Sequence, residues 1–130
     1  MLTFKKSEHL CSKILISYLF TKGKQFYYYP FKVMWLDSET LPETVPAQVL
    51  ISVPKKNIPT AVVRNKIKRR IREAYRKNKI LYNQFLINNS LQNAFVLHYT
   101  EKKIISYKEI EAKIILILHR LQKENEKNIR

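Results

Sequence analysis

The side chains that enzymes use for acid–base, nucleophilic or metal chemistry are scarce in this sequence and stand far apart. The chain has one aspartate, Asp37, one cysteine, Cys11, and three histidines, none with a companion at metal-ligand spacing. Glu73 lies three or four residues from several arginines and lysines, so we interpret it as a charge partner rather than a general base. A glycine-rich phosphate loop is excluded because Gly23 is the only glycine. We therefore expect no catalytic residue and no metal ligand within the protein itself.

Basic residues, in contrast, are abundant and concentrated. The formal net charge is +15, and eleven of the 25 lysines and arginines lie between Lys55 and Lys79. This excess is larger than solubility requires and indicates a polyanionic partner. Arginine in particular favours phosphate, because its planar guanidinium matches phosphate oxygens. An anionic membrane or an acidic protein groove could also attract a basic helix, but no apolar run approaches the ~20 residues of a membrane span.

The hydrophobic pattern predicts the elements that must position these charges. A first helix is expected over residues 7–23, with Ser7 as N-cap, Ile14 and Tyr18 on its inner face, Cys11 buried and Gly23 at a left-handed C-cap. Apolar runs then predict strands over 26–29, 31–36, 47–53 and 93–99, a loop or ragged helix over 80–92, and a closing helix over 107–121. We interpret His98, in the last strand, as a structural histidine.

The basic segment reads as a helix that begins after Thr60. Val63, Ile67, Ile71 and Ala74 follow one another at spacings of four, four and three, which gives one narrow apolar stripe. The opposite side carries polar and charged side chains: Asn65, Lys66, Arg69, Arg72, Glu73 and Arg76. We therefore expect this helix to dock on a core and to turn its charges outward.

Length and composition predict one domain over residues 1–130, with a core over about 3–122 and a frayed tail over 123–130. The order of the elements favours a small sheet with helices packed mostly on one side. An acidic loop over 37–46 is expected to lie away from the basic face. A lone cysteine cannot form an internal disulfide, which fits a reducing cytoplasm.

The stretch SVPKKNIPTAVVRNKIKRRIREAYR, residues 52–76, resembles the signature of the bacterial ribonuclease P protein component. The match combines the order, the spacing and the rare identities of the family pattern over 25 residues. Two departures stand out. Lys66 occupies a position where the family usually has an arginine, so the positive charge is kept but the bidentate guanidinium is lost. The residues NIPT, 57–60, replace the glycine-containing link that usually precedes the helix.

This resemblance implies an α/β (α+β) two-layer sandwich: a small mixed sheet with helices and a left-handed βαβ crossover like that of a ribosomal-protein domain. It implies a 1:1 complex with the catalytic ribonuclease P RNA. That ribonucleoprotein removes the 5′ leader of precursor tRNA, using Mg²⁺ held mainly by RNA and substrate, while the protein alone is not catalytic. The residues implied in RNA binding are Lys55, Lys56, Arg64, Asn65, Lys66, Lys68, Arg69, Arg72 and Arg76.

The resemblance also implies a cleft between the sheet and the first helix that holds the single-stranded leader. Phe20 fits the aromatic residue of that region, and Phe31 or Trp35 could add a base-stacking surface. Two other functions remain open at this point. One is a ribosomal or other structural RNA-binding protein without a role in tRNA processing, and the other is a DNA-binding protein with a basic helix.

Overall fold

The computed structural model of the protein describes residues 4–38, 41 and 45–127, and within them a four-stranded mixed sheet. Its order is β1-β2-β4-β3, in which β1, β2 and β4 are antiparallel and β3 runs parallel to β4. The strands form where the apolar runs predicted them: β1 (Lys24–Tyr28), β2 (Phe31–Asp37), β3 (Ala47–Ser52) and β4 (Asn93–Tyr99). Of the predicted acidic loop, Glu39 and Glu43 lie outside the described residues.

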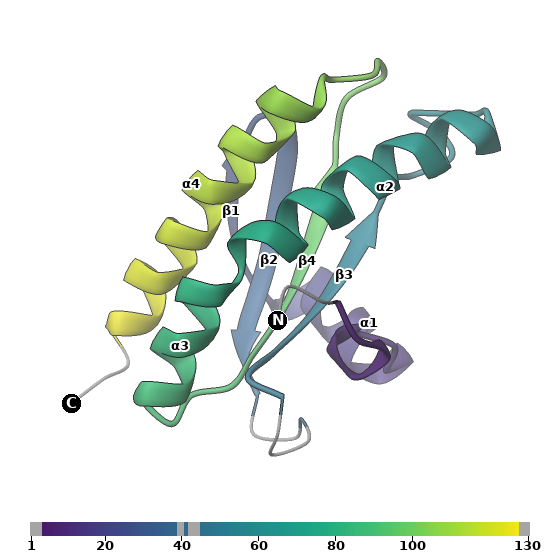
Figure 1. The fold of residues 1–130 in the computed structure, drawn as a ribbon. Coiled ribbons are helices and arrows are strands. Elements are labelled where there is room, and N and C mark those ends of the chain that lie inside the picture. Colours follow the sequence, from purple (N-terminus) through teal and green to yellow (C-terminus); the bar gives the residue numbers. More distant parts are fainter. Residues whose placement is uncertain (1–3, 39–40, 42–44, 128–130) are drawn as a thin grey trace.

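Helices cover both faces of the sheet, unevenly. The longest two, α2 (Ala61–Asn78) and α4 (Tyr107–Glu126), lie side by side on one face, and α3 (Ile80–Asn88) continues from α2 on the same side. The first helix, α1 (Lys13–Lys22), packs on the other face (Figure 1). None of the described helices is long and apolar enough to cross a membrane.

The crossover from β3 through α2 to β4 is left-handed. In Figure 1 both strands run upward, α2 lies in front of them, and β4 is to the left of β3. Parallel crossovers are right-handed in almost all proteins, so this connection is unusual. It confirms the predicted topology and carries the basic helix diagonally across the sheet.

The strand periodicity divides the core into two parts. Phe31, Val33 and Trp35 of β2 face the larger part, together with the buried sides of α2 and α4. Met34 points to the opposite face, where it packs with Leu19 of α1 and with Val96 of β4. The strands β2, β3 and β4 therefore contribute apolar side chains to both layers, as a sheet covered on both faces requires, whereas β1 contributes to the larger part alone.

The beginning of α1 differs from the prediction. The N-cap is Ser12, whose Oγ accepts a hydrogen bond from the Leu15 amide at 3.2 Å, whereas Ser7 belongs to a short 3₁₀ turn. The intervening chain runs along β3, where the Leu10 amide donates to the Val49 carbonyl at 3.0 Å. The helix faces the sheet through Leu15, Ile16 and Leu19, so Ile14 and Tyr18 are exposed instead of inward. Cys11 is exposed in the segment before the helix.

Gly23 ends α1, but not in the left-handed conformation that was predicted. Its backbone is extended, with φ −63° and ψ 151°. The reason for glycine is steric, since a Cβ at this position would lie 2.6 Å from the carbonyl oxygen of Leu19. The chain can therefore turn directly from the helix into β1.

The end of α4 also differs from the expected frayed tail. The helix continues to Glu126, and Asn125 is fully buried. The Asn125 amide donates to Tyr82 Oη at 3.2 Å, and its oxygen accepts from Asn93 Nδ2 at 3.0 Å. Buried polar groups are stable only when they are paired in this way, so the network fixes the last turn of α4 against α3 and β4.

Candidate nucleic-acid interface

The basic helix α2 is held in place by the stripe that its sequence predicted. Ile67, Ile71 and Ala74 are fully buried against the sheet and α4, and Tyr75 extends the buried surface by another position. Val63, at the start of the stripe, is half-buried. Because one side of the helix is fixed in the core, the orientation of its other side is fixed as well.

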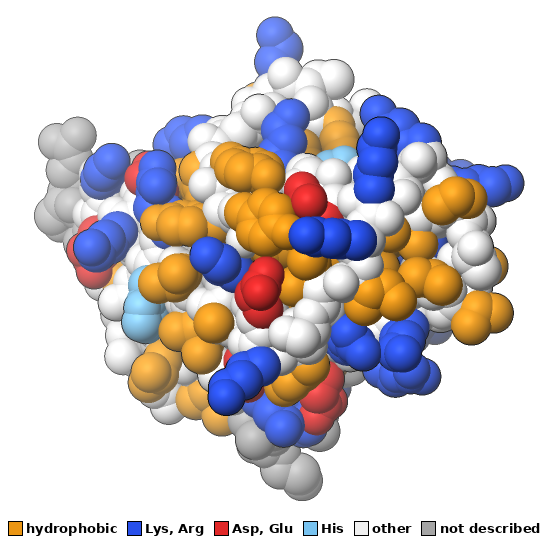
Figure 2. Space-filling model, turned by 90° about the horizontal axis from the view of Figure 1, so that it is seen from above, with side chains coloured by type: hydrophobic (Ala, Val, Ile, Leu, Met, Phe, Trp, Pro, Cys, Tyr) orange, Lys and Arg blue, Asp and Glu red, His pale blue; other side chains and the backbone are white. Residues whose placement is uncertain are grey.

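That other side presents the predicted basic residues. Asn65, Lys66, Arg69 and Arg72 are exposed and Lys68 is half-buried, while Lys55 and Lys56 are exposed in the loop before the helix. Figure 2 shows Lys and Arg side chains without acidic neighbours on its right-hand side, which corresponds in Figure 1 to the beginning of α2 and the loop before it. We call Asn65, Lys66, Lys68, Arg69 and Arg72 the basic face.

Arg64 differs from these residues because its guanidinium also forms hydrogen bonds within the protein. Its Nη1 donates hydrogen bonds to the carbonyl oxygens of Ile58 and Pro59, at 2.9 and 2.8 Å. Thr60 occupies the N-cap position but makes no side-chain cap bond. The guanidinium therefore ties the loop to the first turn of α2.

Two more arginines of α2 bind within the protein. Arg76 donates to Glu73 at 2.5 and 3.0 Å, which confirms Glu73 as a charge partner. This pair lowers the pKa of Glu73 through the hydrogen bond from Arg76. Arg70 donates from Nη1 to the Ile105 carbonyl at 2.8 Å and so fixes the loop before α4. The sequence identifies these arginines as basic but does not identify their partners.

We expect Arg64→Ala to lower the stability of the protein by about 1–3 kcal/mol, because two carbonyl oxygens lose a charged donor. Arg69→Ala is the matched control, since Arg69 is exposed on the same helix and should change stability by less than about 0.5 kcal/mol. Urea denaturation of both variants provides the comparison. Equal midpoints for the two would contradict the structural role of Arg64.

A second polar surface lies on the α1 side of the sheet, beyond the end of that helix. The strand registers align one residue from each strand across this face, namely Tyr27, Lys32, His98 and Ser52. Phe20, near the end of α1, is exposed, and its ring packs edge-on against His98 with centroids 5.9 Å apart. We call these five residues the sheet row.

His98 is the centre of the sheet row. Its Nδ1 lies 3.0 Å from Ser52 Oγ. Partial burial, with Lys32 and Lys56 nearby, lowers the pKa of His98 and so favours the neutral ring. The sequence indicates a structural role for His98 and does not indicate Tyr27 or Lys32 as site residues. The alternation of side chains between the two faces of β2 and β4 could have indicated Lys32 and His98. Each lies two residues along its strand from a residue under α1 and therefore points to the same face.

The prediction that Phe31 or Trp35 offers a surface for base stacking is wrong. Phe31 is 0% exposed and Trp35 is 1% exposed, and both lie in the core beneath α2 and α4. They have the strand parity that points away from α1, so neither ring is accessible to a nucleotide. α1 itself packs directly on the sheet through Leu15, Ile16 and Leu19, which leaves Phe20 as the accessible aromatic of the predicted three.

A hollow of about 200 Å³ lies between α2 and the chain that precedes α1. Lys68 and Arg72 of the basic face line it on one side, and His9 and Cys11 line it on the other. The basic face is therefore indented where it meets the N-terminal segment.

The residues present do not fit a metal site made by the protein alone. Within the described ranges, no three His, Cys, Asp or Glu side chains come close enough to share an ion. The acid of α2, Glu73, is engaged by Arg76 and lies 4.0 Å from Lys77 Nζ. A divalent cation near the basic face would need oxygen ligands from elsewhere.

The fold and the basic face define a class: a small α+β protein with an unusual left-handed crossover that presents cations on one rigid helix. The sequence model of the Ribonuclease P family matches residues 4–122. The chain therefore belongs to the ribonuclease P protein family, and its role is that of the protein subunit of ribonuclease P, an enzyme of tRNA processing.

Individual relatives agree with this assignment. The ribonuclease P protein component of Porphyromonas gingivalis is 35% identical over 107 residues, which cover 82% of this chain and 77% of the relative. That of Petrotoga mobilis is 30% identical over 125 residues, 92% of this chain and 96% of the relative.

Solved structures show the same fold. The RNase P protein of Staphylococcus aureus superposes with a TM-score of 0.68 at 22% identity, covering 89% of this chain and 96% of that one. The RNase P protein of Thermotoga maritima gives a TM-score of 0.65 at 22% identity, with 87% and 96% covered.

Proposed function

We propose that this chain binds the catalytic ribonuclease P RNA through the basic face of α2 and thereby assists removal of the 5′ leader from precursor tRNA. The observation that supports this most strongly is the contrast along one helix. Ile67, Ile71 and Ala74 of its inner stripe are fully buried, and its outer side carries Lys66, Arg69 and Arg72. The acid on that outer side, Glu73, is bound by Arg76. Cations held on a rigid helix match a fixed pattern of phosphates with little loss of side-chain and backbone freedom.

We propose that the sheet row binds unpaired nucleotides of the leader. Phe20 offers an exposed ring on which a base can stack, and Lys32 offers a charge for the adjacent phosphate. The His98–Ser52 pair supplies neutral hydrogen-bonding groups beside that ring. Single-stranded RNA is commonly recognised by this combination of stacking, edge contacts and charge.

The Mg²⁺ ions of the reaction are proposed to be held mainly by RNA and substrate oxygens. The poor fit of the protein's own carboxylates to a metal site supports this assignment. The protein would then contribute positive charge and position, and the hydrolytic chemistry would take place on RNA. We further propose one protein for each RNA, since each chain has one basic face, and a cytoplasmic location.

Phe20→Ala should reduce the preference of the assembled enzyme for precursor over mature tRNA by about five- to a hundredfold, because stacking on one aromatic is worth ~1–3 kcal/mol per base. Tyr18→Ala is the matched control. Tyr18 is an exposed aromatic on the same helix, but it lies on the opposite side of the inward-facing Leu19. The measurement is the ratio of the affinities for precursor and mature tRNA.

A structural RNA-binding protein with no role in tRNA processing predicts a different outcome. Its assembly with RNA would show the same affinity for both tRNA forms, with and without Phe20. If Phe20→Ala lowers the melting temperature but leaves the wild-type ratio intact, the leader is bound elsewhere.

A further inference from the structure

The hollow between α2 and the N-terminal chain is lined by cations that have no acid beside them. Lys68 and Arg72, one turn apart on α2, form one of its walls. Among the residues that the structure describes, no aspartate or glutamate lines the hollow, and neither of these two cations forms an ion pair. The hollow is therefore a positively charged recess that attracts an anion.

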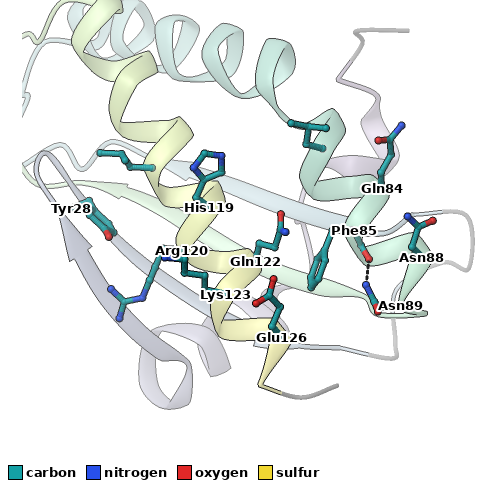
Figure 3. Close-up of a pocket in the computed structure, with 12 residues that line it drawn as sticks. Tyr28, Gln84, Phe85, Asn88, Asn89, His119, Arg120, Gln122, Lys123 and Glu126 are labelled. Carbon is teal, nitrogen blue, oxygen red and sulfur yellow. Dashed lines mark hydrogen bonds between the residues drawn. The ribbon is translucent and has the colours of Figure 1, made fainter. Parts of the chain in front are cut away.

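The larger groove of the surface, between α3 and α4, has a different charge pattern (Figure 3). Its volume is about 930 Å³, and Lys123 and Glu126 both line it. Arg120, on the same α4 wall, donates a hydrogen bond to Glu124 at 2.9 Å. A phosphate in this groove would meet carboxylates as well as cations, so the small hollow is the more favourable of the two for an anion.

The rest of the lining of the hollow is largely apolar. It comes from the N-terminal chain and from β3 and consists of Phe4, His9, Leu10, Cys11, Val49, Leu50 and Ile51. The rings of Phe4 and His9 stack on each other with their centroids 4.0 Å apart. The hollow has a volume of about 200 Å³. Since a cavity of about 150 Å³ can hold one six-membered aromatic ring, the hollow has room for a planar base as well as for an ion.

Both walls of the hollow are fixed by contacts within the protein. The N-terminal chain lies along the β3 edge of the sheet, below α2 in Figure 1, where the Leu10 amide donates to the Val49 carbonyl at 3.0 Å. Glu8 of this chain forms an ion pair with Lys79, which is buried immediately before α3. The opposite wall, α2, is anchored in the core. A ligand would therefore find the hollow already formed and would lose little free energy in ordering it.

We propose that the hollow holds one unpaired nucleotide of the RNA that the basic face binds, with the base on the apolar lining and the phosphate at Lys68 and Arg72. These two cations belong both to the basic face and to the hollow, so the two surfaces are continuous. Unpaired bases are the parts of a structured RNA that proteins stack on aromatic and histidine side chains. The inference rests on the proposed binding of ribonuclease P RNA and adds a position at which the protein selects an unpaired nucleotide.

Cys11 is a direct reporter of ligand binding in the hollow, because it is exposed, lines the hollow and is the only cysteine of the chain. The test measures how fast N-ethylmaleimide, an uncharged reagent, modifies this thiol in the RNA-free protein. Uridine monophosphate, inorganic phosphate and uridine are compared at constant ionic strength. Uridine monophosphate should protect the thiol at a concentration at least about fivefold lower than inorganic phosphate, because stacking of the base adds to the phosphate contact. Replacing both Lys68 and Arg72 by alanine should remove this protection.

Filling the hollow should also weaken RNA binding. The protein modified at Cys11 by N-ethylmaleimide should bind ribonuclease P RNA about five- to a hundredfold more weakly than the unmodified protein, because the stacked base is displaced. The adduct is attached to the folded protein at an exposed thiol, so the melting temperature should stay that of the wild type. The matched control is Cys11→Ser/Asn88→Cys, since Asn88 is exposed in the α3–α4 groove of Figure 3. Modification of this variant should leave its RNA affinity unchanged.

Equal protection of Cys11 by inorganic phosphate and uridine monophosphate would show a plain anion site and overturn the proposal, as would protection by neither. A Cys11 adduct that binds RNA as tightly as the unmodified protein would also overturn it, while RNA binding by the basic face would stand. A wild type that does not bind the RNA would instead refute the proposed function. The measurement with uridine monophosphate needs no RNA, so the two failures are distinguishable.

Discussion

Replacing Lys66, Arg69 and Arg72 together by alanine is expected to weaken binding of ribonuclease P RNA by about a hundredfold or more. Each charged contact to a phosphate is worth ~1–3 kcal/mol, and all three side chains are exposed on the fixed outer side of α2. The loss should also flatten the dependence of log affinity on log salt by up to about 0.9 for each phosphate contact removed. Filter binding or titration of the cognate RNA across a salt series measures both quantities.

The control variant for this experiment loses the same number of positive charges from α4 instead of from α2. Lys108, Lys123 and Lys127 belong to the exposed parts of α4 and its end. Their alanine variant has the same net charge as the α2 variant, so general attraction to a polyanion is reduced equally in both. We expect a much smaller loss of RNA affinity for the α4 variant. Equal losses would show that total charge, and not the basic face, determines affinity.

The second large effect concerns the fold. Ile67→Asp should either leave the protein unfolded at room temperature or lower its free energy of unfolding by several kcal/mol. Ile67 is 0% exposed, so the new carboxylate would be buried without a partner. Circular dichroism during thermal and urea denaturation detects this change. RNA binding should be lost together with the fold.

Val62→Asp provides the comparison within the same helix. Val62 is also β-branched but 77% exposed, in the first turn of α2, where a negative charge suits the helix dipole. Its stability should stay within about 0.5 kcal/mol of the wild type. A native-like transition for Ile67→Asp would mean that α2 is not anchored by its apolar stripe.

Much of the fold could be predicted from local patterns. Four apolar runs of strand length became β1 to β4, and the stripe from Val63 to Ala74 placed the buried side of α2 correctly. These features depend on short-range periodicity, which the sequence contains directly. The start of α1 could not be read in this way. Ser7 and Ser12 are both suitable caps, and only the pairing of the preceding chain with β3 selects Ser12.

In the candidate site, too, some features follow from local sequence patterns and others depend on the tertiary fold. The positions of Lys66, Arg69 and Arg72 on one outer side follow from helical spacing. The roles of Arg64 and Arg70 do not, because they depend on carbonyl oxygens that the tertiary fold brings near. Phe31 and Trp35 were misplaced because a strand with apolar residues on both faces does not reveal which face is covered by which helix. Register with β4 resolves this and brings His98 next to Phe20 instead.

Reconstituted cleavage of precursor tRNA with the cognate RNA at low Mg²⁺ is the most direct test of the proposed role of the protein. We expect that the RNA alone cleaves poorly under these conditions, that addition of the protein restores removal of the 5′ leader, and that the protein alone cleaves nothing. RNA-free, nuclease-free protein that cleaves precursor tRNA in a Mg²⁺-dependent way would contradict it, as would a protein that binds the RNA but leaves leader removal unchanged.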